Sequence, residues 1–197
     1  MKKTIAPKSF YVLFLKRVID IVLALSSVIF LIPIFIIIAM LIKMDSPGPA
    51  IYKQKRLGRY AQGFEIYKFR TMVVDADKIG PGSTSANDRR VTKIGQRLRR
   101  WSLDELPQLF NIIKGDMSIV GYRPGLKKDY SEEEISSGIF DLKPGLTGYA
   151  QVNGRSNISM QAKRYYEAKY AEDVSFILDV KIIFKTIGVV LRAKDSN

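Results

Sequence analysis

The chain has 197 residues, 32 Lys and Arg against 19 Asp and Glu, a formal net charge of +13, and neither Cys nor His. These absences exclude disulfides, thiolate metal sites, cysteine nucleophiles and histidine-based triads, so catalysis would depend on carboxylates, hydroxyls and lysines with a hard metal cation. The positive charge predicts an anionic partner: a nucleic acid, an acidic lipid or a phosphorylated small molecule.

An uncharged apolar run of 22 residues extends from Ile21 to Ile42. It is long enough to cross the hydrocarbon layer as a helix, and it lacks the short core and small-residue cleavage site of a signal peptide. Basic residues flank both of its ends, which draws both ends toward the cytoplasm. Pro33 lies in the middle and interrupts the helical hydrogen bonding. Two arrangements remain open: a spanning helix with a kink, and a re-entrant helix–break–helix.

The remainder of the chain predicts a small mixed domain. Residues 51–56 and 64–71 are rich in β-branched and aromatic residues and indicate a β-hairpin. Its basic surface either protects a solvated edge or faces an anion. The amphipathic pattern of residues 93–100 indicates a basic helix that covers a core or lies on anionic lipid. Further helices are predicted at residues 106–114, where Gly115 ends the helix, and at 159–171 and 176–194.

Adjacent carboxylates, Asp104 and Glu105, follow a cluster of basic side chains. On local grounds a capping role is the commoner explanation: Ser102 and Glu105 fit a capping box, or Asp104 caps a helix with Pro107 in its first turn. Chemistry offers another role, because an aspartate can attack phosphorus to give an acyl phosphate. A neighbouring acid can then help to hold a magnesium ion that neutralises phosphate oxygens.

Several sequence blocks occur in a fixed order from about residue 14 to residue 192. They include Lys16–Asp20, Asp45–Pro49, Tyr67–Met72, Ser102–Leu109, Lys114–Ser118, Pro144–Gly148 and Gln151–Arg155. This ordered set resembles the bacterial sugar transferase family, the monotopic phosphoglycosyl transferases, and in particular its small type. Two positions depart from the family pattern: Ile32 replaces the serine before Pro33, and Tyr122 replaces the first proline of a Pro-Arg-Pro turn.

The resemblance implies an enzyme that transfers a sugar 1-phosphate from a UDP-sugar to undecaprenyl phosphate and releases UMP. This reaction is the first membrane step of glycoconjugate biosynthesis. Asp104 would be the nucleophile that forms a phosphosugar–aspartyl intermediate, Glu105 would support it, and both would hold Mg²⁺. The resemblance further implies that substrate is bound by Arg99, Lys68, Arg70, Arg123, Pro124 and Arg155.

The expected fold is α+β and mainly helical. Residues 1–44 would form a re-entrant membrane segment broken at Pro33, and residues 45–197 a catalytic domain containing the hairpin. This domain would lie on the cytoplasmic face of the bacterial inner membrane, in contact with anionic lipid and with no nucleic acid. The sequence does not specify the sugar, the glycan pathway or the oligomeric state.

Two other functions are consistent with parts of this sequence. A membrane-tethered nucleic-acid-binding module would account for the charge and the basic hairpin. It requires aromatic residues such as Tyr52, Tyr60 and Tyr67 to share one exposed face with the basic residues, and it leaves the carboxylate pair and the apolar run unexplained. A non-catalytic anchor of a polysaccharide assembly complex is the other alternative, and it predicts that the carboxylate pair is dispensable.

Overall fold

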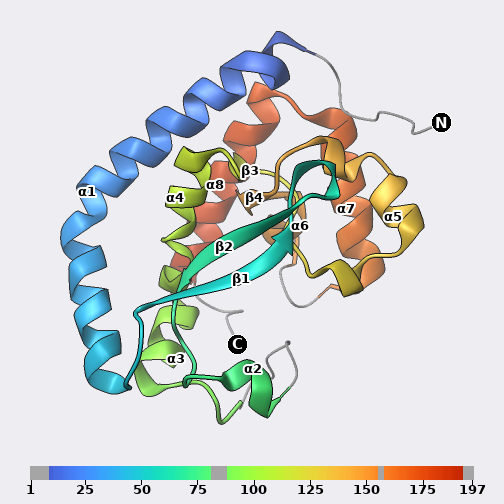
Figure 1. The fold of residues 1–197 in the computed structure, drawn as a ribbon. Coiled ribbons are helices and arrows are strands. Elements are labelled where there is room, and N and C mark those ends of the chain that lie inside the picture. Colours follow the sequence, from blue (N-terminus) through green and yellow to red (C-terminus); the bar gives the residue numbers. More distant parts are fainter. Residues whose placement is uncertain (1–8, 81–87, 155–157, 193–197) are drawn as a thin grey trace.

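The computed structural model describes residues 9–80, 88–154 and 158–192. Figure 1 shows one long helix that follows the outside of a body made of shorter helices and two small sheets. A π-helical turn at Tyr11–Leu15 leads into helix α1 (Lys16–Asp45). Together these form the one helix in the described ranges that is long and apolar enough to cross a membrane. The expected α+β, mainly helical class is confirmed.

Helix α1 does not contain the predicted break. It continues as an α-helix through Pro33 and bends as an arc around the body (Figure 1). Proline removes one helical hydrogen bond, but tertiary packing supports the helix on both sides of this position. Ala24 packs in one core cluster before Pro33, and Ile38 and Ile42 pack in another after it. The helix–break–helix prediction is therefore wrong as secondary structure, because this packing holds the chain helical across the proline.

The predicted hairpin is confirmed. Strands β1 (Ile51–Leu57) and β2 (Gly63–Phe69) pair antiparallel, with Tyr52 opposite Lys68 and Lys53 opposite Tyr67. Because side chains alternate between faces, Tyr52 and Tyr67 lie on opposite faces of the hairpin. The hairpin does not provide the single aromatic face that the nucleic-acid-binding alternative requires.

The helix boundaries agree closely with the sequence where local signals are strong. Helix α3 spans Lys93–Arg100, and α4 spans Gln108–Lys114 and ends at Gly115, whose φ of 102° is readily adopted by glycine. The other helices are α2 (Ala76–Ile79), α5 (Glu132–Ser136), α6 (Tyr149–Val152), α7 (Met160–Asp173) and α8 (Phe176–Arg192). The predicted helices at 159–171 and 176–194 correspond to α7 and α8; residues 193–197 lie outside the described residues.

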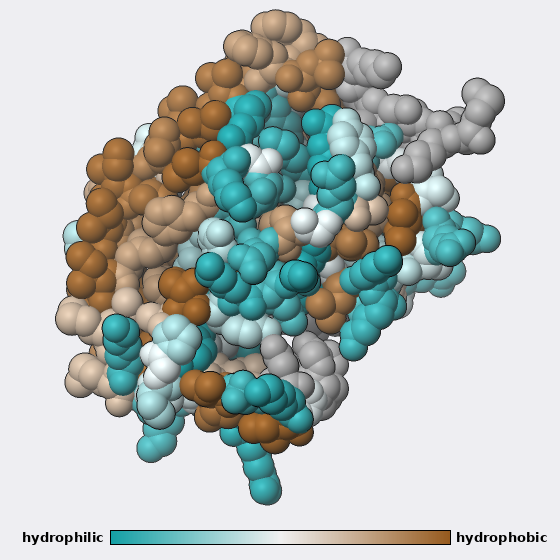
Figure 2. Space-filling model, viewed as in Figure 1, coloured by the Kyte–Doolittle hydropathy of each residue, from teal (hydrophilic) through white to brown (hydrophobic). Residues whose placement is uncertain are grey.

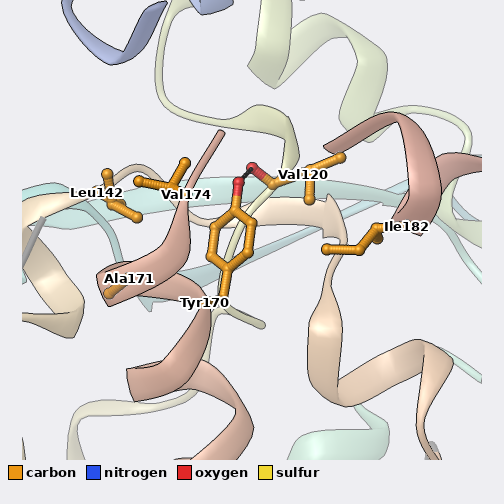
Figure 3. Close-up of a cluster of buried hydrophobic side chains, with 6 residues drawn as sticks. All are labelled: Val120, Leu142, Tyr170, Ala171, Val174 and Ile182. Carbon is orange, nitrogen blue, oxygen red and sulfur yellow. Dashed lines mark hydrogen bonds between the residues drawn. The ribbon is translucent and has the colours of Figure 1, made fainter. Parts of the chain in front are cut away.

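A second sheet was not predicted. Strands β3 (Ser118–Val120) and β4 (Gly145–Thr147) pair in parallel. Helices α7 and α8 pack on this sheet through a core of Val120, Leu142, Tyr170, Ala171, Val174 and Ile182 (Figure 3). The buried Tyr170 hydroxyl shares its proton between the Val120 carbonyl oxygen at 3.1 Å and Asp179 Oδ1 at 2.7 Å, which ties α7 to β3 and α8 (Figure 3 draws the first contact).

Candidate active site

A short 3₁₀ turn, Leu103–Glu105, places the two adjacent carboxylates between α3 and α4. Leu103 and Leu106 pack into the core cluster that contains Phe69 and Leu98, which anchors the turn. Ser102 precedes it with a φ of 55° and makes no side-chain capping bond, and α4 is preceded by Pro107 without a side-chain cap. The capping interpretations are therefore wrong, and the carboxylates are available for another role.

Glu105 is held by two cations from different parts of the chain. Its Oε1 accepts hydrogen bonds from Lys68 Nζ of β2 at 3.0 Å and from the Arg123 guanidinium, in the turn after β3, at 2.7 Å. Burial alone would raise the pKa of Glu105, but Arg123 and Lys68 outweigh it and hold this pKa well below its usual range. Glu105 is consequently ionised at any physiological pH.

Asp104 has the opposite environment. Its side chain is buried, with 9% of the residue exposed, and none of the described residues donates a hydrogen bond to it. Burial, followed by the charge of Glu105, raises the pKa of Asp104, while Lys68, Arg99 and Arg123 act against this increase. An ionised Asp104 is thus a carboxylate whose charge is not compensated by a direct partner.

Four of the six predicted substrate-binding residues lie at this site. Lys68 and Arg123 contact Glu105. Arg99 lies near enough for its charge to lower the pKa of Asp104. The Arg99 Nε donates to Thr71 Oγ1 at 2.9 Å. Pro124 lines the adjacent pocket. Arg155 lies outside the described residues.

Arg70, a predicted substrate-binding residue, contacts the segment after α1 rather than the carboxylate pair. Its guanidinium donates to the Pro47 and Ser46 carbonyl oxygens at 2.8 and 2.7 Å and is directed at the exit from α1. Arg70 follows the end of β2, and its backbone N–H donates to the Ala50 carbonyl oxygen at 2.8 Å, which places it beside the segment that leaves α1. The structure therefore assigns Arg70 to holding the chain after α1.

A small polar pocket of about 60 Å³ opens beside Glu105. Its lining residues are Arg56, Ile66, Lys68, Glu105, Gln108, Arg123 and Pro124. Neither Arg56 nor Gln108 is among the site residues predicted from the sequence. Strand alternation could have indicated Arg56, since it lies on the same face of the hairpin as Lys68. Nothing in the sequence indicated Gln108.

The two carboxylates have the chemistry that a magnesium ion requires. The described residues contain no group of three or more acidic, Cys or His side chains that could hold a metal alone. Magnesium bound at a phosphate-transfer site commonly takes one or two carboxylates and completes its ligands with substrate phosphate and water. Asp104 and Glu105 supply these two carboxylates, and the charge of Asp104 is not otherwise neutralised by a direct contact, so the residues present fit such an ion.

Comparison with known sequences identifies similar proteins over almost the whole chain. The sequence model described as bacterial sugar transferase matches residues 11–193. The exopolysaccharide production protein ExoY of Rhizobium meliloti is 37% identical over 92% of this chain and 87% of its own length. The UDP-galactose-lipid carrier transferase of Erwinia amylovora is 39% identical over 91% of this chain and 41% of its own length. The UDP-glucose:undecaprenyl-phosphate glucose-1-phosphate transferase of Escherichia coli is 40% identical over 88% of this chain and 39% of its own length. This chain thus spans about two fifths of the length of the last two proteins.

Proposed function

Because this chain belongs to the bacterial sugar transferase family, we propose that it transfers a sugar 1-phosphate from a UDP-sugar to undecaprenyl phosphate and releases UMP. The reaction would begin the assembly of a membrane-linked glycan. The observation that carries the proposal is the Asp104–Glu105 pair, set among Lys68, Arg99 and Arg123. The donor and acceptor named for the E. coli relative support the choice of substrates.

Asp104 is the proposed nucleophile. One of its carboxylate oxygens attacks the phosphorus that carries the sugar, the bridging P–O bond breaks, and UMP leaves with the bonding electron pair. A phosphate oxygen of the lipid acceptor then attacks the same phosphorus, and Asp104 departs as a carboxylate. Burial without a direct partner disfavours the charge of free Asp104, and formation of the acyl phosphate removes that charge. This environment favours the first step.

Glu105 has a supporting role in this mechanism. Its ion pairs with Lys68 and Arg123 keep both cations beside the nucleophile, where the donor's phosphates must bind. Asp104 and Glu105 would hold the magnesium ion, which supplies neutralisation of negative charge on the phosphate oxygens. We therefore expect EDTA to abolish UMP release without lowering the melting temperature. Full turnover in excess chelator would show that the reaction requires no metal ion.

The proposed location is the cytoplasmic face of the bacterial inner membrane, with α1 entering one leaflet and returning. Contacts of both ends of α1 with the same body support this topology. Near the start of the helix, Lys16 pairs with Asp179 of α8. At its end, Asp45 Oδ2 accepts a hydrogen bond from the Ile94 backbone N–H of α3 at 3.0 Å. A straight spanning helix would place these two ends on opposite sides of the bilayer.

The outer face of α1 supports contact with lipid. Figure 2 shows apolar residues along the whole arc of α1, next to the hydrophilic surface of the body. Large exposed side chains there include Val22, Ile29, Phe30, Ile36, Ile37 and Met40. Such a continuous apolar surface is typical of a membrane contact. The basic helix α3, which lies near the end of α1, is suited to anionic headgroups.

Thiol labelling tests the topology, because the chain has no native Cys. Ser9→Cys probes the region before α1, and Glu172→Cys probes the exposed surface of α7. Re-entry predicts that an impermeant reagent labels neither position in intact cells and labels both in inverted vesicles. Labelling of Ser9→Cys from the periplasmic side would establish a spanning helix instead.

Mass spectrometry of the intact protein tests the chemistry. With a panel of UDP-sugars and no acceptor, the wild-type chain should release UMP and gain the mass of one sugar phosphate. Asp104→Asn should show neither, whereas Glu132→Gln, which changes an exposed carboxylate on α5, should behave as wild type. An unmodified wild-type protein under turnover, together with an active Asp104→Asn enzyme, would end the case for an aspartyl intermediate.

A further inference from the structure

Arg56 is a cation at the candidate site to which neither the family resemblance nor the proposed mechanism assigns a role. It lies on β1, opposite Phe64, and on the same face of the hairpin as Lys68. Arg56, Lys68 and Arg123 all line the small pocket, where Glu105 is the one acidic lining residue. Three cations therefore surround a pocket with one carboxylate.

The charges in this pocket are unevenly matched. Glu105 is paired with both Lys68 and Arg123. The Arg56 guanidinium instead donates to a neutral acceptor, Gln54 Oε1, at 2.5 Å, and no carboxylate of the described residues forms an ion pair with it. Burial, followed by repulsion from Arg123, lowers the pKa of Arg56. The surroundings of Arg56 thus disfavour its own charge, and a bound anion would relieve this cost.

The lining of the pocket indicates which anion fits. Besides the cations it offers the side chain of Gln108, a residue that is 2% exposed, and the apolar surface of Ile66. A guanidinium presents paired N–H donors that match the oxygens of a phosphate group. The pocket is small, and its excess of positive charge suits a group that carries more than one negative charge.

We propose that Arg56 binds the phosphate of the donor that departs with the nucleoside, an inference that rests on the proposed function. When Asp104 attacks the sugar-bearing phosphorus, the bridging P–O bond breaks and its electron pair passes to the departing phosphate. Arg56 would stabilise the charge that develops there. Lys68 and Arg123 lie beside the Asp104–Glu105 pair, and Arg56 is a third cation, close to the C-terminal end of β1.

The position of Arg56 along β1 favours the donor over the lipid acceptor. The strand begins at Ile51, shortly after α1 ends at Asp45, and Arg56 is near its other end. Arg56 therefore lies at the end of β1 that is farther along the chain from the exit of α1. Leu57, the next residue, donates its backbone N–H to the Gly125 carbonyl oxygen at 3.1 Å, which fixes this end of the strand against the turn that carries Arg123.

Separate measurement of the two half-reactions tests this assignment on the full chain in lipid nanodiscs. Arg56→Gln should form the phosphosugar intermediate from donor alone about 10- to 100-fold more slowly. Arg56→Lys should recover part of the rate because it keeps the charge. Lys55→Gln, on the opposite and exposed face of β1, is the matched control and should retain the wild-type rate. Once the intermediate is formed, its transfer to the acceptor should proceed at the wild-type rate in all variants.

The binding of UMP supplies an independent measurement. Calorimetric titration should show that Arg56→Gln weakens UMP binding at least about tenfold, while thermal melting confirms that the variant is folded. Equal UMP affinity in wild type and Arg56→Gln, or no UMP binding by the wild type, would overturn the assignment. Slowing of the acceptor step alone would also overturn it and would place the lipid phosphate at Arg56. Failure of the proposed function would give a different result, because the wild type would then form no intermediate from any donor. The UMP titration would still test whether Arg56 binds the phosphate.

Discussion

Two buried aspartates in this protein have opposite surroundings. Asp179 on α8 is 4% exposed and lies between α1 and α7. It accepts hydrogen bonds from the hydroxyls of Tyr11 at 2.5 Å and Tyr170 at 2.7 Å, and it pairs with Lys16. Each of its two oxygens therefore has a partner, and the contacts join the consecutive helices α7 and α8 to the helical segment at the start of the chain.

Asp104 is almost as deeply buried, at 9% exposed, but it receives no hydrogen bond from the described residues and is adjacent to Glu105. Burial is similar in the two cases, so burial does not distinguish a structural carboxylate from a reactive one. The partners distinguish them: the charge of Asp179 has direct partners that join helices, whereas burial and Glu105 disfavour the charge of Asp104, as the proposed nucleophilic role requires.

The sharpest test of this contrast is Asp104→Asn. We expect UMP release to fall by at least about 10⁴-fold, because an amide cannot replace the carboxylate nucleophile. The free energy of unfolding at pH 7 should increase, because the substitution removes a buried charge and its repulsion from Glu105. Turnover assays together with chemical denaturation measure both quantities. A large loss of stability would show that Asp104 is structural after all.

The reverse result is expected for Asp179→Asn. Removing this charge leaves Lys16 buried without its ionic partner, which should lower the free energy of unfolding by about 3 kcal/mol. The turnover of the folded fraction should remain within a few-fold of wild type, since Asp179 does not contact the site. Chemical denaturation measures the loss of stability. The amount of phosphosugar intermediate formed measures the fraction of active protein, so turnover can be expressed per active molecule. Unchanged stability would contradict the structural role.

The pH dependence of stability tests the raised pKa of Asp104. The raised pKa of Asp104 means that the folded chain binds its proton more tightly than the unfolded chain, where the pKa is near 3.8. Ionised Asp104 therefore costs stability at neutral pH, and this cost is lost as the pH falls through the raised pKa. Asp104→Asn should be more stable than wild type at pH 7, with a difference that closes toward pH 4. A difference that is constant over this range would contradict the raised pKa.

The smallest effect is expected from an exposed ion pair. Lys169 and Asp173 lie four residues apart on α7, 3.0 Å apart, with both side chains about half exposed. Solvent screens such a pair, so Lys169→Gln should change the free energy of unfolding by less than about 0.5 kcal/mol. Denaturation of this variant beside Asp179→Asn provides the baseline for a pair at the surface. A loss of stability as large as that of Asp179→Asn would show that burial does not explain why the two ion pairs contribute differently to stability.

Sequence patterns predicted those parts of the fold that depend on neighbouring residues. The hairpin, α3 and the end of α4 at Gly115 lie where alternation, amphipathic spacing and a glycine place them. The parallel pair β3–β4 was missed because its strands are three residues each and distant in sequence. Short strands of this kind carry little periodic signal, and their pairing depends on the packing of α7 and α8.

The sequence by itself determined the chemistry available to this protein: no Cys or His, one long apolar segment, and an Asp104–Glu105 pair among basic residues. Tertiary structure alone decided how these features are used. Packing on both sides of Pro33 keeps α1 helical, because core contacts offset the loss of one hydrogen bond. Strand geometry directs Lys68 and Arg56 toward the pocket and leaves Arg70 at the exit from α1. Charges act through distance and burial, which local sequence does not encode. Only the fold therefore separates the proposed nucleophile, Asp104, from the structural Asp179.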